Sequence, residues 1–459
     1  MVEVLQIDTP ELGDRSYLVH DGEAALVIDP QRDTDRVTAL ASDAGVRITH
    51  VAETHVHNDY VTGGLALARA AGAAYLVNAD DPVSFDRTPV SDGDLVEIGG
   101  MRVRALATPE HTYTHLAYVV EAGGDEADGR VAGVFTGGSL LYGSTGRTDL
   151  LGPDDTAALT RAQWASARRL ARELPDSARI FPTHGFGSFC SATQSEAAAS
   201  STIGHEKLVN PALTLDETSY VESLLAGLDA WPAYYAHMAP ANLAGPTGPD
   251  LSPPRPADAA ELRRRIEAGE WVVDLRDRIA FAAGHVPGTF SFPLDDRFAT
   301  YLGWMIPWGT PLTLLGDSPG QVAQAQRDLA RIGIDRPAAA ATGRPETWAG
   351  ERGVVSLRLV KFGDLAAALG AGNGGPVVLD VRRRLEWEEG HIADAVHIPL
   401  HELPGRVAEL PSGEVWVHCG SGYRSILAAS ILAAHGRRVV SVDDDFESAA
   451  AAGLAVERA

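Results

Sequence analysis

Apolar and polar positions alternate in short runs through the first half of the chain. Runs such as "AALVID", "AYVVEA" and "VAGVFTGG" are typical of strands, because they are short, apolar and bounded by turn residues. Two longer stretches, residues 58–72 and 156–175, have apolar residues at helical spacing and end at glycine or proline. Many strands with interspersed helices predict an α/β domain over residues 1–238, with two sheets packed between helices.

The second half of the chain contains a duplicated pattern. Residues 239–256 are rich in proline and glycine, which is typical of a linker. Residues 271–294 and 377–400 then repeat one order: an apolar strand, Asp-x-Arg, a short helix, Gly-His and Pro-Leu. A repeat of this length is too long for a solenoid and predicts two small α/β domains, over residues 257–352 and 355–459.

Length and charge limit the classes of function. The chain has 459 residues, enough for about three domains, and a formal net charge of −24. Such an acidic protein repels nucleic acid and anionic membranes, so neither is expected as a partner. The start, "MVEVLQIDTPELGD", lacks signal-peptide features, and no apolar run reaches membrane-spanning length. We expect a soluble, cytoplasmic protein, and the sequence leaves open whether it forms a homo-oligomer.

Two cysteines, Cys190 and Cys419, are present, which excludes a disulfide framework. Cys419 follows the apolar run "EVWVH" and precedes a predicted helix. The loop residues after it are Gly420, Ser421, Gly422, Tyr423 and Arg424. Glycines allow backbone N–H groups to point at the sulfur, and the helix N-terminus and the arginine add positive charge. This setting favours a thiolate or a persulfide anion, whereas a buried, inert thiol is the alternative interpretation.

These residues carry a resemblance to a known family. The loop "CGSGYRS", preceded by "LDVR", "EWEEGHI" and "HIP", resembles a rhodanese domain across residues 355–459. The resemblance implies that Cys419 carries sulfane sulfur as a persulfide and that Arg424 is a loop charge. It also implies that Asp380 and Arg382 form a structural ion pair rather than act in catalysis.

The first repeat resembles an inactive rhodanese-homology domain. Aligning Gly320 with Gly422 places Asp317 at the position of Cys419 and Val322 at that of the loop arginine. An aspartate cannot carry sulfur, and its charge would repel a persulfide. The block is therefore expected to serve packing or docking.

Several metal-ligand residue types follow apolar runs in the first half of the chain. Strand ends would project these side chains into a common cleft, and five such groups in this order predict a metal site. The five candidates are His55, His57, Asp59, His111 and His184. His50, His115 and His205 lack this context and are interpreted as structural or surface residues.

The order and spacing of these candidates resemble the metallo-β-lactamase superfold over residues 1–235. Within it, "FTG" and "GRTD" resemble the persulfide dioxygenases and their glyoxalase II relatives. The resemblance implies an αββα sandwich and matches Arg147 to an arginine near the thiol substrate, where it could anchor a carboxylate or a sulfur anion. The alternative is that Arg147 and Asp149 form a pair that braces the loop.

Two positions depart from that family pattern. The family's aspartate ligand after "FTG" is Gly138 here, and the third histidine of the first loop is Tyr60. In two-metal hydrolases both missing groups serve the second metal, which would keep only Asp59 and His184. A two-zinc hydrolase is therefore not expected.

One metal ion is expected instead. The first metal would keep His55, His57 and His111. The resemblance favours Fe(II), but the iron dioxygenases use two histidines and the carboxylate that Gly138 replaces. Iron would thus need Asp59, a third histidine or an unidentified acid, and three histidines would also suit Zn(II).

Cys190 follows His184 in the glycine- and serine-rich segment "HGFGSFC", where a buried core thiol is less expected. Fusions of a persulfide dioxygenase with rhodanese domains resemble this layout, including a cysteine a few residues after the histidine. The resemblance implies that Cys190 holds or receives a persulfide near the metal. A packed small residue in a loop is the alternative.

The leading functional hypothesis is a sulfur-metabolism enzyme with two coupled sites. A low-molecular-weight thiol persulfide would be oxidised with O₂ to sulfite at the metal, and Cys419 would transfer sulfane sulfur, with sulfite or thiosulfate as partners. One alternative is a mononuclear zinc thioesterase fused to a rhodanese. Another is a degenerate metal domain that serves as a scaffold for a sulfur carrier.

Overall fold

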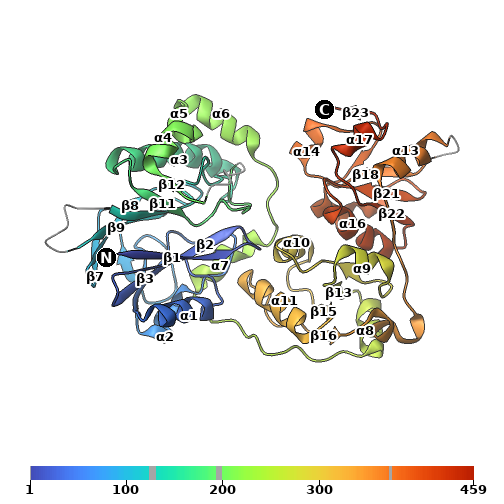
Figure 1. The fold of residues 1–459 in the computed structure, drawn as a ribbon, viewed down its shortest axis with the longest axis horizontal. Helices are drawn as coiled ribbons and strands as arrows, with labels where there is room; N and C mark the ends of the chain where they lie inside the picture. The colour runs from blue at the N-terminus through green and yellow to red at the C-terminus, as the bar shows by residue number, and fades with distance from the viewer. Residues whose placement is uncertain (1, 124–130, 193–198, 372–374, 459) are drawn as a thin grey trace. The chain divides into compact units, whose positions relative to one another are not determined.

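The computed structural model divides into two compact units (Figure 1). The residues that the structure describes are 2–123, 131–192, 199–371 and 375–458. Unit 1 is Met1–Asp250 with Ala330–Gly333, and unit 2 is Leu251–Leu329 with Ile334–Ala459.

Unit 1 contains two six-stranded sheets. The first has the order β1-β2-β3-β4-β5-β6, antiparallel from β1 to β3 and parallel from β3 to β6. Its strands are β1 (Glu3–Thr9), β2 (Asp14–His20), β3 (Ala24–Ile28), β4 (Arg47–Ala52), β5 (Ala74–Asn78) and β6 (Thr88–Val90).

The second sheet has the order β12-β11-β10-β9-β8-β7, in which only β10 and β11 pair in parallel among the described strands. Its strands are β7 (Leu95–Ile98), β8 (Met101–Ala107), β9 (Leu116–Ala122), β10 (Val131–Gly137), β11 (Arg179–Pro182) and β12 (Ser201–Thr202).

Helices cover the outer faces of both sheets, and aromatic side chains fill the space between them. Tyr17, Phe135 and Phe181 pack with ring centroids 5.0–5.5 Å apart in that inner core. Helices α1 and α2 pack on the first sheet, and α3, α4 and α6 on the second (Figure 1). The predicted αββα sandwich is confirmed. The helices are α1 (Asp35–Ala44), α2 (Gly64–Ala71), α3 (Pro153–Glu173), α4 (Ile203–Val209), α5 (Pro211–Thr214), α6 (Glu217–Gly227) and α7 (Tyr235–Ala244).

Two sequence expectations need correction in unit 1. The helix expected from residue 58 begins only at Gly64, because the preceding backbone forms the loop that carries the histidines. The linker expected from residue 239 begins later as well, since α7 continues to Ala244 with Pro240 inside it. Residues 245–255, all described, form no helix or strand.

Unit 2 contains two parallel sheets with the same core order of strands. The first is β14-β13-β15-β16, and the second is β17-β22-β21-β18-β20. Their strands are β13 (Trp271–Asp274), β14 (Phe290–Ser291), β15 (Leu312–Gly316), β16 (Ala339–Thr342), β17 (Arg358–Val360), β18 (Val377–Asp380), β20 (Val396–His397), β21 (Val415–His418) and β22 (Val439–Val442), with a separate pair β19 (His391–Ile392) and β23 (Val456–Glu457).

Helices flank both of these sheets. They are α8 (Ala259–Glu267), α9 (Arg278–Ala283), α10 (Phe298–Met305), α11 (Pro319–Arg331), α12 (Pro345–Ala349), α13 (Phe362–Gly370), α14 (Arg384–Glu389), α15 (Leu403–Arg406), α16 (Tyr423–Ala434) and α17 (Ser448–Ala451), with short 3-10 turns at Gly350–Arg352, Leu400–Glu402 and Val407–Glu409.

The duplication extends to side-chain geometry. Arg276 donates from Nη2 to Asp274 at 2.6 Å and to the carbonyl oxygen of residue 284 at 2.8 Å. Arg382 makes the same two bonds, to Asp380 at 2.7 Å and to the carbonyl of residue 390 at 2.6 Å. Both pairs are buried and fix the turns that follow β13 and β18, as expected for a structural pair.

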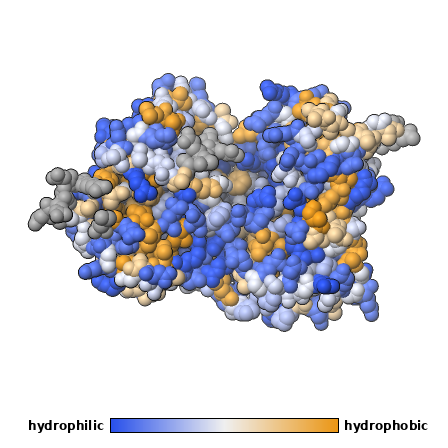
Figure 2. All heavy atoms as spheres, in the orientation of Figure 1, coloured by the Kyte–Doolittle hydropathy of each residue, from blue (hydrophilic) through white to orange (hydrophobic). Residues whose placement is uncertain are grey.

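Hydrophilic and hydrophobic side chains are mixed on the surface. Figure 2 shows hydrophilic residues interspersed with smaller hydrophobic groups on the face that it presents. Among the described residues, no helix combines the length and the hydrophobicity that crossing a bilayer requires.

Candidate functional site

The predicted metal-ligand residues meet at one edge of the unit 1 sandwich. They lie in the loops that follow β4, β8 and β11, so strand ends bring together residues far apart in the chain. The His55 ring centroid lies 4.2 Å from that of His57, 4.6 Å from that of His111 and 5.3 Å from that of His184. All four rings are buried.

Four overlapping groups of side chains in this cluster have ligand atoms within 4.8 Å of one another. Some of their members were predicted from the sequence and others were not. The groups are His55–His57–His184, His55–Glu110–His111, Asp59–His184–Cys190 and Asp29–Glu53–His57.

His57 lies in a network of acidic and phenolic groups. Its Nε2 is 3.2 Å from both an Asp29 oxygen and a Glu53 oxygen, and 2.9 Å from the Tyr60 hydroxyl. Burial alone would lower the pKa of His57, but Asp29 and Glu53 outweigh it and raise the pKa to about 10. Tyr60, which stands where a third histidine was expected, thus holds an existing ligand candidate in place.

His184 is held by two aspartates. Its Nδ1 lies 2.9 Å from Asp14 and 3.1 Å from Asp59. Burial opposes a charged imidazole, but the two carboxylates raise the pKa of His184 well above its ordinary value. Asp14 had no motif to mark it in the sequence.

Cys190 is fully buried beside Asp59 and His184. The sequence interpretation that this loop disfavours a buried thiol is therefore wrong. The loop is tied to the segment at Arg147, whose backbone N–H donates a hydrogen bond to the Cys190 carbonyl oxygen at 2.8 Å. Burial, followed by the charges of Asp59 and Asp14, raises the pKa of the Cys190 thiol well above its ordinary value. Its role as a persulfide carrier stays a prediction.

Glu110 and His115 were missed as members of the cluster. His115, interpreted from sequence as structural, is fully buried, with its ring stacked 5.0 Å from that of His55. Its Nε2 lies 3.4 Å from the Glu110 carboxylate, which is also fully buried. His50, by contrast, is half-buried beside Thr49, and His205 is exposed.

The Arg147 side chain is buried and makes four hydrogen bonds with the described residues. Two go to Asp149, at 2.6 and 2.8 Å, and two to the carbonyl oxygens of Phe189 and Asp229, at 3.1 and 2.7 Å. These contacts fit the interpretation of a pair that braces the loop. Substrate binding by Arg147 stays a prediction.

The donor set fits a metal ion. Neither nitrogen of His111 and neither carboxylate oxygen of Glu110 has a hydrogen-bond partner among the described residues, although all four atoms are buried. Unpartnered buried polar atoms cost free energy unless another group satisfies them. Imidazole and carboxylate are ligands for zinc and for non-haem iron. A metal in this cluster would therefore satisfy groups that the protein leaves open.

The second predicted site is the loop after β21 in unit 2. Cys419 follows that strand directly, and α16 begins four residues later at Tyr423. Gly422 between them has φ +89°, and a Cβ there would lie 2.0 Å from an oxygen of Asp443, so this turn requires glycine. Cys419 is 1% exposed. The Cys419 side chain is therefore almost completely shielded from solvent.

Arg424 is paired with Glu386, which the sequence interpretation did not include. Nη1 and Nη2 of Arg424 each lie 2.6 Å from one Glu386 oxygen. Burial alone would raise the pKa of Glu386, but Arg424 outweighs it and lowers that pKa to about 2. Arg424 lies at the Cys419 loop, since a Cβ on Gly420 would be 3.2 Å from its Nη2.

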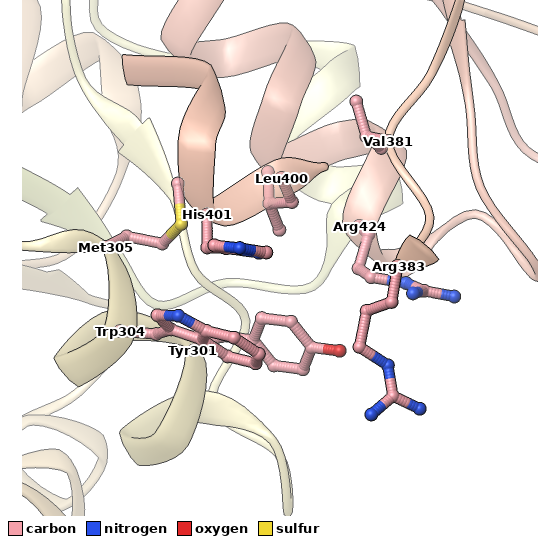
Figure 3. Close-up of a pocket in the computed structure, with 8 residues that line it drawn as sticks. All are labelled: Tyr301, Trp304, Met305, Val381, Arg383, Leu400, His401 and Arg424. Carbon is pink, nitrogen blue, oxygen red and sulfur yellow. The ribbon is translucent and has the colours of Figure 1, made fainter. Parts of the chain in front are cut away.

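The first repeat contributes side chains to a small cavity at this loop. Figure 3 shows Trp304 stacked on His401, with centroids 4.8 Å apart, and the Tyr301 hydroxyl directed toward the arginine side of the cavity. The cavity volume is about 10 Å³, room for roughly one water molecule. Its lining residues are Tyr301, Trp304, Met305, Val381, Arg383, Leu400, His401 and Arg424.

The alignment of Asp317 with Cys419 needs correction by one residue. Asp274 pairs with Leu315 in the first sheet, and the equivalent Asp380 pairs with His418 in the second. The residue equivalent to Cys419 is therefore Gly316, which follows Leu315. The loop before α11 is shorter by one residue, which the ungapped comparison could not detect.

Comparison with known proteins agrees with both halves of this description. The Metallo-beta-lactamase superfamily model matches residues 11–184, and the Rhodanese-like domain model matches residues 363–452. The human protein named persulfide dioxygenase ETHE1, mitochondrial, is 28% identical over 211 residues, which cover 45% of this chain and 74% of that protein.

Two further relatives extend the comparison. The hydroxyacylglutathione hydrolase of Rhodopseudomonas palustris (strain BisA53) is 31% identical over 244 residues, covering 46% of this chain and 88% of that protein. A crystal structure of a metallo-beta-lactamase from Staphylococcus aureus subsp. aureus COL has a TM-score of 0.66 at 27% identity, covering 75% of this chain and 99% of that one. The chain therefore belongs to the metallo-beta-lactamase superfamily and carries a rhodanese-like domain near its C-terminus.

Proposed function

We propose that the chain is a persulfide dioxygenase and sulfurtransferase, with one metal in unit 1 and a persulfide-forming cysteine in unit 2. The observation that carries the proposal is the buried cluster of histidines and carboxylates around His55, present in the same chain as the Cys419 loop. The similarity to the human persulfide dioxygenase supports oxygen chemistry, and the rhodanese-like domain supports sulfur transfer.

The first reaction is the oxidation of a low-molecular-weight persulfide. One persulfide RSSH, one O₂ and one water yield the thiol RSH, sulfite and two protons. The S–S bond breaks, the terminal sulfur is oxidised and O₂ is reduced. When bound in the cluster, iron(II) would supply the redox chemistry that a reaction with O₂ requires.

The protein supplies order around that centre. Asp14 and Asp59 fix the ring of His184, while Tyr60 and Glu53 fix that of His57. Residues held in this way keep the ligand atoms in place for a positioned reaction. All of these side chains are buried, which excludes bulk water from the cluster.

The second reaction transfers sulfur through Cys419. The persulfide anion of Cys419 reacts with sulfite, the S–S bond breaks, and thiosulfate leaves with the terminal sulfur while the Cys419 thiolate is restored. Charge is conserved, and no oxidant is needed. The Arg424 guanidinium lies beside the sulfur and would stabilise both anions. Cys190 would serve as a second persulfide carrier close to the metal cluster.

The deciding experiment combines metal analysis with O₂ consumption. The protein is purified without oxygen, its iron and zinc are measured, and O₂ uptake is followed with glutathione persulfide. Iron-dependent uptake with sulfite formation is expected. Full zinc occupancy without persulfide-dependent O₂ uptake would reject the dioxygenase proposal.

A hydrolase is the second candidate, because the relative at 31% identity is a hydroxyacylglutathione hydrolase. Several histidines around one ion would suit zinc, which supplies an activated water for thioester cleavage. In that case added Zn²⁺ restores thioesterase activity and no O₂ is consumed. If unit 1 is only a scaffold, the protein shows neither O₂ uptake nor thioesterase activity. His55→Ala then has no effect, and only Cys419 is reactive.

A further inference from the structure

Glu110 is a buried carboxylate surrounded by imidazole rings. One oxygen lies 3.2 Å from Nδ1 of His111, and the other lies 3.4 Å from Nε2 of His115 and 4.0 Å from Nε2 of His55. Its side chain is fully buried, and neither oxygen accepts a hydrogen bond from the described residues. A carboxylate in this condition is costly unless a cation completes its environment.

Two glycines provide the space that this carboxylate occupies, because neither has a side chain. A Cβ on Gly138 would lie 2.2 Å from one Glu110 oxygen and 2.7 Å from the other. A Cβ on Gly146 would lie 2.4 Å from the same carboxylate. The Glu110 side chain therefore occupies the space into which a side chain at position 138 would project. An aspartate at 138 is what the family resemblance predicts.

Among the other carboxylates of the cluster, Glu53, Asp59 and Asp14 each have one oxygen without a hydrogen-bond partner in the described part of the chain, whereas Glu110 has two. Asp29 accepts hydrogen bonds from the Thr54 N–H and hydroxyl, both at 2.7 Å, and from the Thr183 hydroxyl. Glu53 accepts bonds from Thr62 at 2.5 Å and Tyr75 at 2.8 Å.

The same contrast holds for the histidines. His57 and His184 are tied to acidic side chains, as described above. His111 contacts only Glu110 among the acidic side chains for which an ion pair is found, through Nδ1, and neither of its ring nitrogens makes a hydrogen bond with the described residues. His55, Glu110 and His111 thus form the group in which the carboxylate and a histidine are still open to a ligand.

We propose that Glu110 is the carboxylate ligand of the metal, together with His55 and His111, and that it replaces the aspartate missing at Gly138. The chain would then place the carboxylate on the loop after β8 instead of at the end of β10. The ligand class is a divalent first-row metal that accepts two imidazoles and one carboxylate. The assignment rests on one part of the proposed function, the presence of a metal. It does not depend on which reaction the metal supports.

The test measures metal binding in the full-length protein with Fe²⁺ and Zn²⁺ as probes. Glu110→Gln keeps the shape of the side chain but removes its charge. We expect its metal affinity to fall by at least tenfold, about the least that loss of a supporting contact costs. At the same metal concentration, metal should also raise the melting temperature of the wild type by more than that of the variant. Glu206→Gln, at a fully buried carboxylate of unit 1 that belongs to none of the ligand groups, is the matched control and should keep its metal.

A paired exchange separates loss of a ligand from misfolding. Glu110→Gly should lose metal, and Gly138→Asp alone should clash with Glu110. The double variant Glu110→Gly/Gly138→Asp should recover metal binding, because the carboxylate then enters the same space from position 138. Recovery in the double variant is the signature of a ligand, since a purely structural role of Glu110 does not predict it.

The proposal is overturned if Glu110→Gln retains wild-type metal affinity, or if Glu53→Gln or Asp59→Asn loses it while Glu110→Gln does not. A folded double variant without metal also counts against it. Metal content and O₂ uptake are measured separately, so a metal-loaded wild type without dioxygenase activity would reject the proposed reaction and leave the ligand assignment standing.

Discussion

Arg424 and Glu386 form a two-pronged ion pair beside Cys419, with both nitrogen–oxygen distances at 2.6 Å. The side chains are 14% and 28% exposed, so the pair is largely shielded from solvent. The rhodanese-type loop therefore does not present a lone positive charge to the sulfur. It presents an arginine whose orientation is fixed by an acid at the start of α14.

Glu386→Gln should weaken the domain and reduce its sensitivity to acid. The folded-state pKa of Glu386 is about 2, below its ordinary value of 4.5. Its contribution to stability is thus complete above pH 4.5 and is lost as the pH falls toward 2. At pH 7 we expect the free energy of unfolding to fall by about 1–3 kcal/mol, a value between those typical of exposed and of buried ion pairs. Urea unfolding from pH 7 to pH 3 should show a shallower pH dependence for the variant.

The control for that experiment is Glu388→Gln on the same helix. Glu388 pairs with Arg384 at 2.7 Å, but both side chains are about half exposed. We expect a change within about 0.5 kcal/mol. Equal effects of the two substitutions would contradict a special role for the pair beside Cys419.

Cys419→Ser should abolish sulfur transfer and leave unit 1 intact. A hydroxyl cannot form a persulfide, so thiocyanate formation from thiosulfate and cyanide should fall to the uncatalysed rate. Metal content should not change, because Cys419 belongs to unit 2 and the metal cluster to unit 1. Persistent thiocyanate formation would mean that Cys190 is the sulfur carrier.

The position of the metal cluster could be predicted because strand ends leave a signal in sequence. His55, His111 and His184 each follow an apolar run, and a strand end directs the following loop to one edge of the sheet. Glu110 lies in the same loop, directly before His111, but an acidic residue beside a histidine does not by itself indicate a ligand. Its place in the cluster depends on empty space at Gly138, a relationship between two distant loops that no local pattern records.

The duplicated blocks were also predictable, but the register within them was not. Asp274 and Asp380 stand at the same point of two similar turns, which the repeated sequence letters show directly. The loops that follow β15 and β21 differ by one residue, and only the strand pairing places the difference. Comparison of the two repeats therefore showed that the first lacks the cysteine, but it placed the equivalent position one residue too late.

Cys190 should react slowly with alkylating reagents in the native protein. It is fully buried, and burial together with Asp59 and Asp14 raises the pKa of its thiol, so little thiolate is available at pH 7.5. Mass spectrometry after iodoacetamide treatment of metal-free Cys419→Ser protein should show rapid labelling only in denaturant. Rapid native labelling would mean that this loop opens, and the burial described here would not govern its chemistry.

Trp304→Ala should open the cavity at the Cys419 loop. Trp304 is 6% exposed and stacks on His401, so its removal should destabilise unit 2 by about 3 kcal/mol. The space left should admit larger sulfur acceptors, lowering KM for a bulky thiol relative to cyanide. Trp308→Ala, at a tryptophan that is 43% exposed, should change stability and KM little. An unchanged ratio of KM values in a folded Trp304→Ala protein would show that the first repeat does not shape this site.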